Sequence, residues 1–99
     1  MKTPLNPTTA SPGLDQWPTQ TWAEIASLVP ARDDEDRAVL LRLLEIGFLP
    51  GEPVRVIARG LPGGDPLAVR VGHTTFALRR HEASMILVRA QAVGGASAP

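Results

Sequence analysis

The chain has 99 residues with ten acidic and ten basic side chains, so it is one small domain with no net charge. A neutral chain has no overall field to attract nucleic acid or an anionic membrane, and the absence of cysteine excludes disulfides and thiolate metal sites. No apolar run approaches the ~20 residues of a membrane span, and the N-terminus lacks a signal-peptide pattern. We therefore expect a cytoplasmic protein.

Both ends of the chain are predicted to lie outside the folded domain. Residues 1–18 contain four of the ten prolines, with threonine, serine and asparagine between them. Such a segment buries too little apolar surface to offset its chain entropy, so we expect a disordered tail. The alternative is an arm that binds a partner through Leu14 and Trp17. By the same reasoning the domain covers residues 19–90, and residues 91–99 form a second disordered tail.

The domain is predicted to open with a short helical turn over residues 21–25, with Thr19 or Thr21 as its cap. In a helix, Trp22 and Ile25 would share one face. Ser27-Leu28-Val29 then reads as a short first strand, which Pro30 ends.

Four acidic residues, Asp33-Asp34-Glu35-Asp36, mark the start of a helix that runs to Ile46. Asp33 or Asp34 caps this helix. A calcium or iron site is the alternative, but the run lacks the alternating ligands and turn glycine of a calcium loop. Apolar residues at three- and four-residue spacing predict a face turned to the core, formed by Val39, Leu40, Leu43, Leu44 and Ile46 or Gly47.

The stretch Arg42-Leu43-Leu44-Glu45-Ile46-Gly47-Phe48-Leu49-Pro50-Gly51 predicts a helix end followed by a corner. Gly47 can adopt the left-handed conformation that closes many helices. Phe48 and Leu43 then occupy the two positions that touch in a Schellman ending. Pro50 prevents the helix from continuing.

After this corner the apolar residues recur at every second position, which is typical of strands. A segment dense in turn formers (60–66), the pair Gly72-His73 and a short helical turn (81–84) separate these strands. Four or five short strands with one buried face favour a closed sheet. We therefore predict a mainly β protein: a small SH3-like β-barrel with a helix inserted between its first and second strands. The strand segments are 54–59, 67–71, 74–79 and 86–89.

The sequence shows no catalytic set and no cofactor motif. Ser84 has no evident base nearby, so we expect no enzyme activity. His73 and His81, with Asp65 and Glu82, are the only candidates for binding a soft metal. A tight site within one chain needs three or four converging ligands, so no metal site is expected. Surface histidines, or a weak or intermolecular site, are the two interpretations that remain.

Six arginines fall mainly at outward positions of the predicted strands: Arg55, Arg59, Arg70, Arg79, Arg80 and Arg89. Small barrels bind RNA through such surfaces, but single-stranded nucleic acid usually also needs stacking aromatics. Phe76 belongs to the inward set, so no aromatic is expected on that face. Solvated arginines, a protein-binding surface and a nucleic-acid surface all remain as interpretations.

Three segments together resemble the FeoA family: the Arg42–Gly51 corner, Gly64-Asp65-Pro66, and Ala77-Leu78-Arg79-Arg80-His81-Glu82-Ala83-Ser84-Met85-Ile86-Leu87-Val88. Their order and spacing make the resemblance specific, and it spans roughly residues 21–90. It implies a small cytosolic SH3-like protein of bacterial ferrous iron uptake. Family members usually have a glycine and a longer first strand after the opening turn, so we expect either a short first strand or a barrel that is partly open at that edge.

The resemblance further implies a non-enzymatic accessory protein that binds FeoB, a membrane transporter with a cytosolic GTP-binding domain, and regulates its assembly or GTP cycle. It would then be recruited to the inner membrane face. The expected contact residues are Phe48, Leu49, Leu61, Arg79 and Arg80. Two alternatives remain, an RNA-binding barrel and a divalent-metal carrier or sensor that uses His73 and His81. An incomplete first strand also leaves self-association open.

Overall fold

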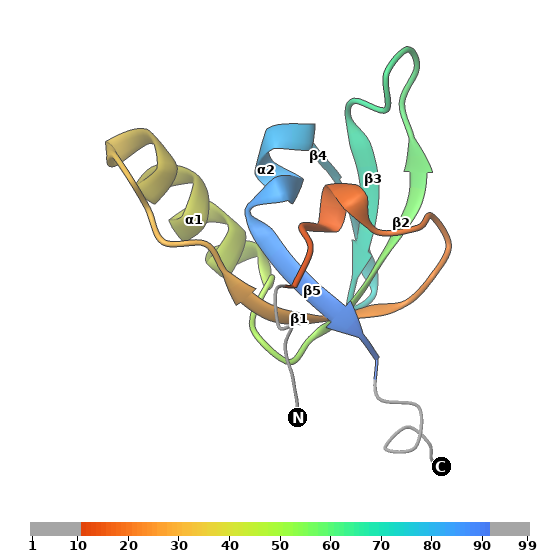
Figure 1. The fold of residues 1–99 in the computed structure, drawn as a ribbon, viewed down its shortest axis with the longest axis horizontal. Coiled ribbons are helices and arrows are strands. Elements are labelled where there is room, and N and C mark those ends of the chain that lie inside the picture. Colours follow the sequence, from red (N-terminus) through yellow and green to blue (C-terminus); the bar gives the residue numbers. More distant parts are fainter. Residues whose placement is uncertain (1–10, 92–99) are drawn as a thin grey trace, which may run out of the picture.

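Five strands form one antiparallel sheet in the computed structural model, which describes residues 11–91 (Figure 1). In space the strands follow the order β4-β3-β2-β1-β5, so β4 and β5 are the two edges. Within residues 11–91, no helix has the length and apolar character that crossing a bilayer requires. The strands are β1 (Ala23–Leu28), β2 (Pro53–Arg59), β3 (Leu67–Val71), β4 (Thr74–Leu78) and β5 (Ile86–Ala90).

The inner face of the sheet carries the core, as the alternating pattern predicts. In β3, Leu67, Val69 and Val71 are buried, whereas the intervening Ala68 and Arg70 are only half-buried. The ring of Phe48 lies 6.0 Å from the ring of Phe76, centroid to centroid, at a tilted angle of 59°. The remaining fully buried side chains include Leu14, Ile25, Leu43, Val54, Val56, Leu78, Ile86 and Val88.

An irregularity in β2 changes one sequence-based assignment. The pairing of β2 with β3 shifts between Val56 and Ala58, which leaves Ile57 as an extra residue. A bulge of this kind interrupts the alternation of faces and increases the local bend of the strand. Regular alternation from Val54 and Val56 would place Ala58 on the inner face, but it pairs with Ala68 on the outer face instead.

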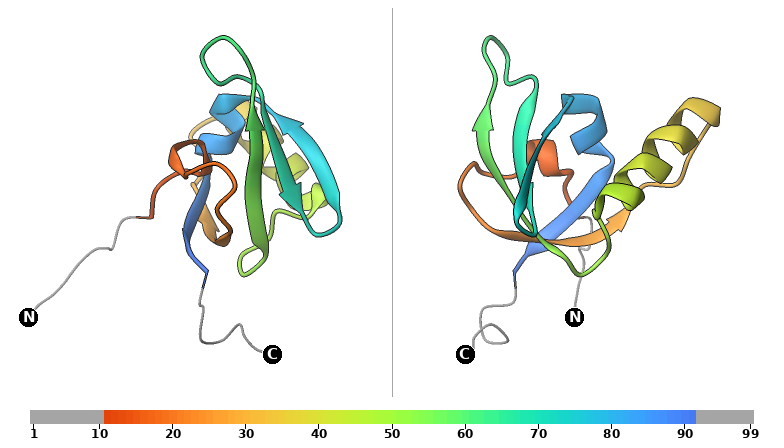
Figure 2. Two further views of the ribbon diagram at one scale, coloured as in Figure 1. Left: turned by 90° about the vertical axis from the view of Figure 1, so that its right-hand side faces the viewer. Right: turned by 180° about the vertical axis from the view of Figure 1, so that it is seen from behind.

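The sheet does not close into the predicted barrel. Among the described residues β4 and β5 do not pair, so the strands form a curled open sheet. Helix α2 (Arg80–Ser84) connects these two edges, and the 3-10 turn η2 (Leu14–Gln16) packs against it. Figure 2 shows α2 and η2 side by side across the open side of the sheet. Local helices therefore cover the gap that strand pairing would close in a complete barrel.

The folded domain begins before Thr19, so the predicted boundary is wrong. Leu14 is completely buried in the core. Gly13 forms a β-bridge with Leu87, and the Val88 N–H donates to the Pro12 carbonyl at 2.9 Å. The prediction failed because it used the average composition of residues 1–18, and one buried apolar residue, Leu14, is enough to anchor the segment. The predicted tails at residues 1–10 and 92–99 lie outside the described residues.

Arg59 fastens this N-terminal segment to the end of β2. Its guanidinium donates to the carbonyl of Asp15 at 2.9 Å and to the carbonyl of Trp17. Its Nε also donates to Thr19 Oγ1 at 2.9 Å. The side chain of Arg59 is thus a structural clamp, a role that none of the three sequence-based interpretations of the strand arginines included.

The predicted helical turn at residues 21–25 is also wrong, because this segment enters β1. Ala23 and Ile25 are buried, whereas Trp22 is 37% exposed, which is the alternation of a strand. β1 pairs with β2 on one side and β5 on the other, and these long-range hydrogen bonds override the local preference for a turn. The helical turn near the N-terminus is η2 instead.

Helix α1 (Asp34–Ile46) has the predicted bounds and the predicted caps. The Asp33 carboxylate accepts the backbone N–H of Asp36 at 2.8 Å, as an N-cap should. At the other end, Gly47 has a φ of 122°, and its N–H donates to the Leu44 carbonyl at 3.1 Å. The Phe48 N–H donates to the Leu43 carbonyl at 3.0 Å, which completes the Schellman ending.

Fewer apolar residues of α1 face the core than the sequence pattern predicts. Leu43 is completely buried, but Leu44 is 38% exposed and Leu41 is 54% exposed. Figure 1 shows why, since α1 lies to one side of the sheet and does not cover it. Leu44 was therefore assigned to the core incorrectly. The helix is therefore stabilised by its caps at Asp33 and Gly47 and by the one side that carries Leu43 into the core.

The capping role of Asp33 gives a first test. Replacing Asp33 with alanine is expected to lower the free energy of unfolding by about 1 kcal/mol, because the N–H of Asp36 loses its acceptor. Urea denaturation measures this change. The matched control is Asp34→Ala, which removes a neighbouring exposed acid whose carboxylate forms no hydrogen bond among the described residues. Equal effects of the two substitutions would contradict the capping role.

Candidate functional site

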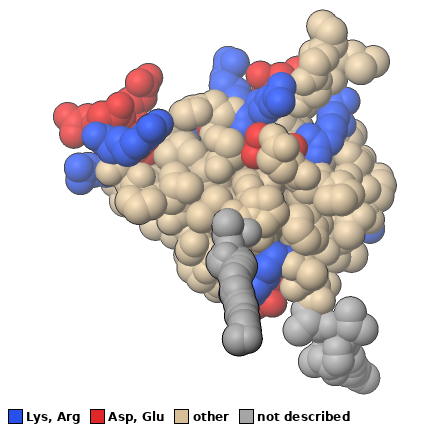
Figure 3. All heavy atoms as spheres, viewed as in Figure 1, with Lys and Arg blue, Asp and Glu red and all other residues tan. Residues whose placement is uncertain are grey.

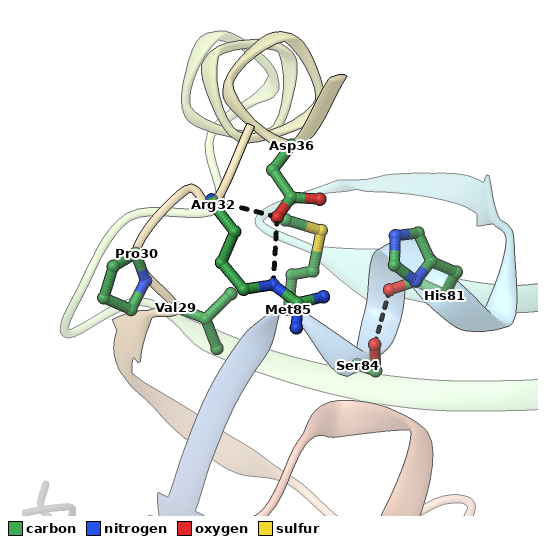
Figure 4. A pocket seen from close by; sticks show the side chains of 7 residues that line it. All are labelled: Val29, Pro30, Arg32, Asp36, His81, Ser84 and Met85. Carbon is green, nitrogen blue, oxygen red and sulfur yellow. Dashed lines mark hydrogen bonds and ion pairs between the residues drawn. The ribbon is translucent and has the colours of Figure 1, made fainter. Parts of the chain in front are cut away.

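A hollow of about 440 Å³ lies between α1 and α2 (Figure 4). Its walls come from the segment after β1, from the start of α1 and from α2. Figure 4 shows side chains from these three parts of the chain converging on the hollow. The lining residues are Val29, Pro30, Arg32, Asp36, His81, Ser84 and Met85.

The floor of this cleft is apolar. Val29, Pro30 and Met85 supply it, and Met85 is only 3% exposed. The Val29 N–H donates to the Met85 carbonyl at 3.0 Å, which holds the two sides of the floor together. A floor of this kind suits an apolar side chain, since burial of apolar surface is favourable and needs no specific donor.

The start of α1 forms a charged rim on one side. The Asp36 carboxylate is nearly buried, accepts the Arg32 N–H at 3.1 Å and lies 3.5 Å from Arg32 Nε. Across the gap, Arg42 of α1 forms an ion pair with Glu82 of α2. Figure 3 shows the acidic side chains gathered at the outer end of α1. Of these contacts, the Arg42–Glu82 pair is the one that links α1 to α2.

Ser84 and His81 both line the cleft, but they do not form a nucleophile and its base. The Ser84 hydroxyl donates to the backbone carbonyl of His81 at 2.6 Å, so its proton is not directed to the imidazole. Among residues 11–91, no group of three or more His, Cys, Asp or Glu lies close enough to hold a metal ion.

The two histidines proposed as metal candidates are not brought together. His73 precedes β4 and His81 follows it, so the whole strand lies between them. Five residues of extended chain span roughly 17 Å, which exceeds the separation of two ligands on one metal ion. A site that uses both histidines of one chain is therefore excluded by the fold.

The predicted contact residues fall at two separate places. Phe48 was assigned to the partner surface incorrectly, because it is completely buried in the core. Leu49 is 44% exposed and precedes β2, whereas Leu61 is 93% exposed and follows it. Seven extended residues place these two leucines roughly 20 Å apart.

The loop that carries Leu61 is tied to the segment that carries Arg79 and Arg80. The Arg80 N–H donates to Asp65 Oδ1 at 3.0 Å, which ties the loop that carries Leu61 to the start of α2. The Arg79 N–H donates to Glu82 Oε1 at 2.9 Å, and both arginine side chains are exposed. We call these three residues, together with His81 and the cleft, the α2 surface.

Sequence reasoning missed most of the α2 surface. His81 was singled out, but only as a metal candidate, and the cleft floor of Val29, Pro30 and Met85 was not predicted. Fifty residues separate Pro30 from His81 in the chain, so no local pattern links them. Sequence reasoning also placed no aromatic on the outer face of the sheet, where Trp22 in fact lies over Arg55.

Comparison with known proteins finds one matching family model and several similar solved structures. The family model for the FeoA domain matches residues 14–90. FeoA from Stenotrophomonas maltophilia is 43% identical, with a TM-score of 0.68, over 78% of this chain and 88% of that chain. That protein was solved with zinc and is described as a prokaryotic SH3 domain protein, proposed as an activating factor for ferrous iron transport.

Two solution structures are similar as well. FeoA from Chlorobium tepidum is 29% identical over 81% of this chain and 70% of that chain, with a TM-score of 0.67. A FeoA-like protein from Clostridium acetobutylicum shares the fold at 24% identity, with a TM-score of 0.71 over 87% of this chain and 93% of that chain. No curated protein matches the chain.

Proposed function

Because this chain belongs to the FeoA family, which is associated with ferrous iron transport, we propose that it is a cytoplasmic, non-enzymatic accessory protein that binds FeoB. FeoB is the membrane transporter of the system, and binding would regulate its assembly or its GTP cycle. The observation that carries this proposal is the family match over residues 14–90 together with 43% identity to the Stenotrophomonas maltophilia protein.

We place the contact with FeoB at the α2 surface. The cleft has an apolar floor and a volume of about 440 Å³, which is enough for one or two side chains of a partner segment. Arg79 and Arg80 are exposed where α2 begins, directly before the cleft residue His81 in the chain, and they offer hydrogen bonds to carboxylates. Leu61, at 93% exposure, adds an apolar contact on the neighbouring loop. Apolar anchors beside arginines are the typical chemistry of a protein interface.

A metal-carrier role has less support. The relative from Stenotrophomonas maltophilia was solved with zinc, but here His73 and His81 lie at opposite ends of β4. Each histidine would have to bind alone or with a second molecule. We therefore treat metal binding as secondary to binding of the transporter.

The proposal is tested by a pull-down of the cytosolic domain of FeoB and of full-length FeoB on the immobilised protein. Retention of both is expected in a buffer where circular dichroism shows the immobilised protein to be folded. A folded, unrelated β-barrel protein on the same matrix is the control. Failure to retain either form of FeoB under these conditions would rule the function out.

A further inference from the structure

The outer face of the sheet carries an aligned row of four side chains that the proposed function does not use. Arg55 of β2 lies directly opposite Arg70 of β3, which lies opposite Thr75 of β4. Ala23 pairs with Val54, so Trp22 takes the next position, beside Arg55. Trp22, Arg55, Arg70 and Thr75 therefore form one row across four neighbouring segments, which we call the arginine row.

The arginine row is electrostatically unbalanced. Two cations directly opposite each other on neighbouring strands repel and destabilise the strand pair. All ten acidic residues of the chain lie within residues 11–91, and none forms an ion pair with Arg55 or Arg70. The Nε of Arg55 is buried without an acceptor among the described residues. The positive charge of the row is thus left for an external anion.

Trp22 orients one of these cations. The guanidinium carbon of Arg55 lies 4.7 Å from the centre of the Trp22 ring, which is the geometry of a cation–π contact. This contact restricts the rotamers of Arg55 before any ligand arrives, so less entropy is lost on binding. Because Trp22 is still 37% exposed, its ring also remains available to a ligand.

An apolar trough runs beside the arginine row. The bulge at Ile57 brings Ala58 opposite Ala68, and Ala68 lies opposite Ala77, so three alanines lie side by side. They floor a hollow of about 200 Å³ that Gly60 and Pro66 close on the far side. Side chains this small allow the backbone of an extended chain to approach the sheet closely.

From this arrangement we propose that the outer face binds a short, extended acidic segment of a partner protein. The carboxylates would bind Arg55 and Arg70, and the backbone of the segment would lie along the alanine trough. A single-stranded nucleic acid fits less well, because it usually needs several stacking aromatics and Trp22 is the one aromatic side chain of the arginine row. The proposal does not depend on the proposed function, since its test uses no transporter.

The test uses the full chain and a fluorescein-labelled peptide of alternating glutamate and alanine. Fluorescence anisotropy at low salt is expected to show saturable binding that weakens as salt is added. In the Trp17→Phe variant, Trp22 is the only tryptophan, so a change in its emission on addition of the peptide reports contact with the arginine row.

Reversal of the charge at Arg70 distinguishes a loss of peptide binding from a loss of stability. Arg70→Glu replaces the like-charged pair with an opposite-charged pair, so the thermal midpoint is expected to stay constant or rise. The same variant is expected to bind the peptide at least about tenfold more weakly, because one cation becomes a repelling anion. The control Arg37→Glu makes the same change of charge on the exposed side of α1 and is expected to leave binding unchanged.

Three results would overturn the proposal. The first is no binding of the peptide to the folded wild-type chain at low salt. The second is an equal loss of binding in the Arg70→Glu and Arg37→Glu variants, which would mean that only net charge matters. The third is tighter binding of an oligouridine than of the peptide with the same dependence on Arg70, which would make the face a nucleic-acid surface.

Discussion

Replacing Leu14 with alanine is expected to lower the free energy of unfolding by about 2–5 kcal/mol. Leu14 is completely buried, and it anchors η2 against α2 on the side where the sheet is open. Its loss leaves a cavity between these two elements and weakens the closure of the core. Small domains have a total stability of roughly 5–15 kcal/mol, so this substitution removes a large share of it.

Urea denaturation of the full chain measures this effect, and Leu61→Ala is the matched control. Leu61 is 93% exposed, so its truncation is expected to change the stability by less than about 0.5 kcal/mol. If Leu14→Ala were as mild as Leu61→Ala, the segment before Thr19 would not belong to the folded domain.

The double substitution Arg79→Gln and Arg80→Gln is expected to weaken binding to the cytosolic domain of FeoB about tenfold, or about 1.4 kcal/mol. Both side chains are exposed at the edge of the α2 surface, and each offers charged donors to a partner carboxylate. The fold uses the backbone N–H groups of these residues, which bond to Glu82 and Asp65, and glutamine retains those groups.

Isothermal titration calorimetry of the double variant measures this loss. The control is Arg37→Gln, which removes one positive charge from the exposed side of α1 and is expected to bind as the wild type does. An unchanged affinity of the double variant would remove Arg79 and Arg80 from the interface.

Features that depend on neighbours in the sequence could be predicted accurately. The cap at Asp33, the bounds of α1 and the Schellman ending at Gly47 all arise from bonds between residues three to five apart. A short stretch of sequence contains every group that takes part in them. The same holds for the alternating strand β3 and for the short helix α2.

Features that depend on distant partners were predicted poorly. Leu14 gains its importance from α2 and β5, which lie about 70 residues further along the chain. The segment after Thr21 becomes a strand because β2 and β5 pair with it on both sides. The bulge at Ile57 moves Ala58 to the outer face, and no residue in β2 is of a type that predicts a bulge.

Parts of the candidate site could likewise be predicted from the sequence, and other parts could not. Arg79, Arg80 and Leu61 were chosen from the sequence because of the family resemblance, and in the fold Asp65 links the loop that carries Leu61 to Arg80. Phe48 was chosen with them, but the Schellman ending turns its side chain into the core. The cleft beside α2 depends on how α1 is placed, which only the three-dimensional arrangement reveals.

The most direct test of the proposed interface is an NMR titration of the isotope-labelled protein with the cytosolic domain of FeoB. The largest changes in amide shift are expected at three segments around the α2 surface, residues 29–32, 60–66 and 79–85. Changes limited to the opposite end of the sheet, around Leu49 and His73, would contradict the α2 surface as the docking site. The absence of any change with the folded protein would contradict binding itself.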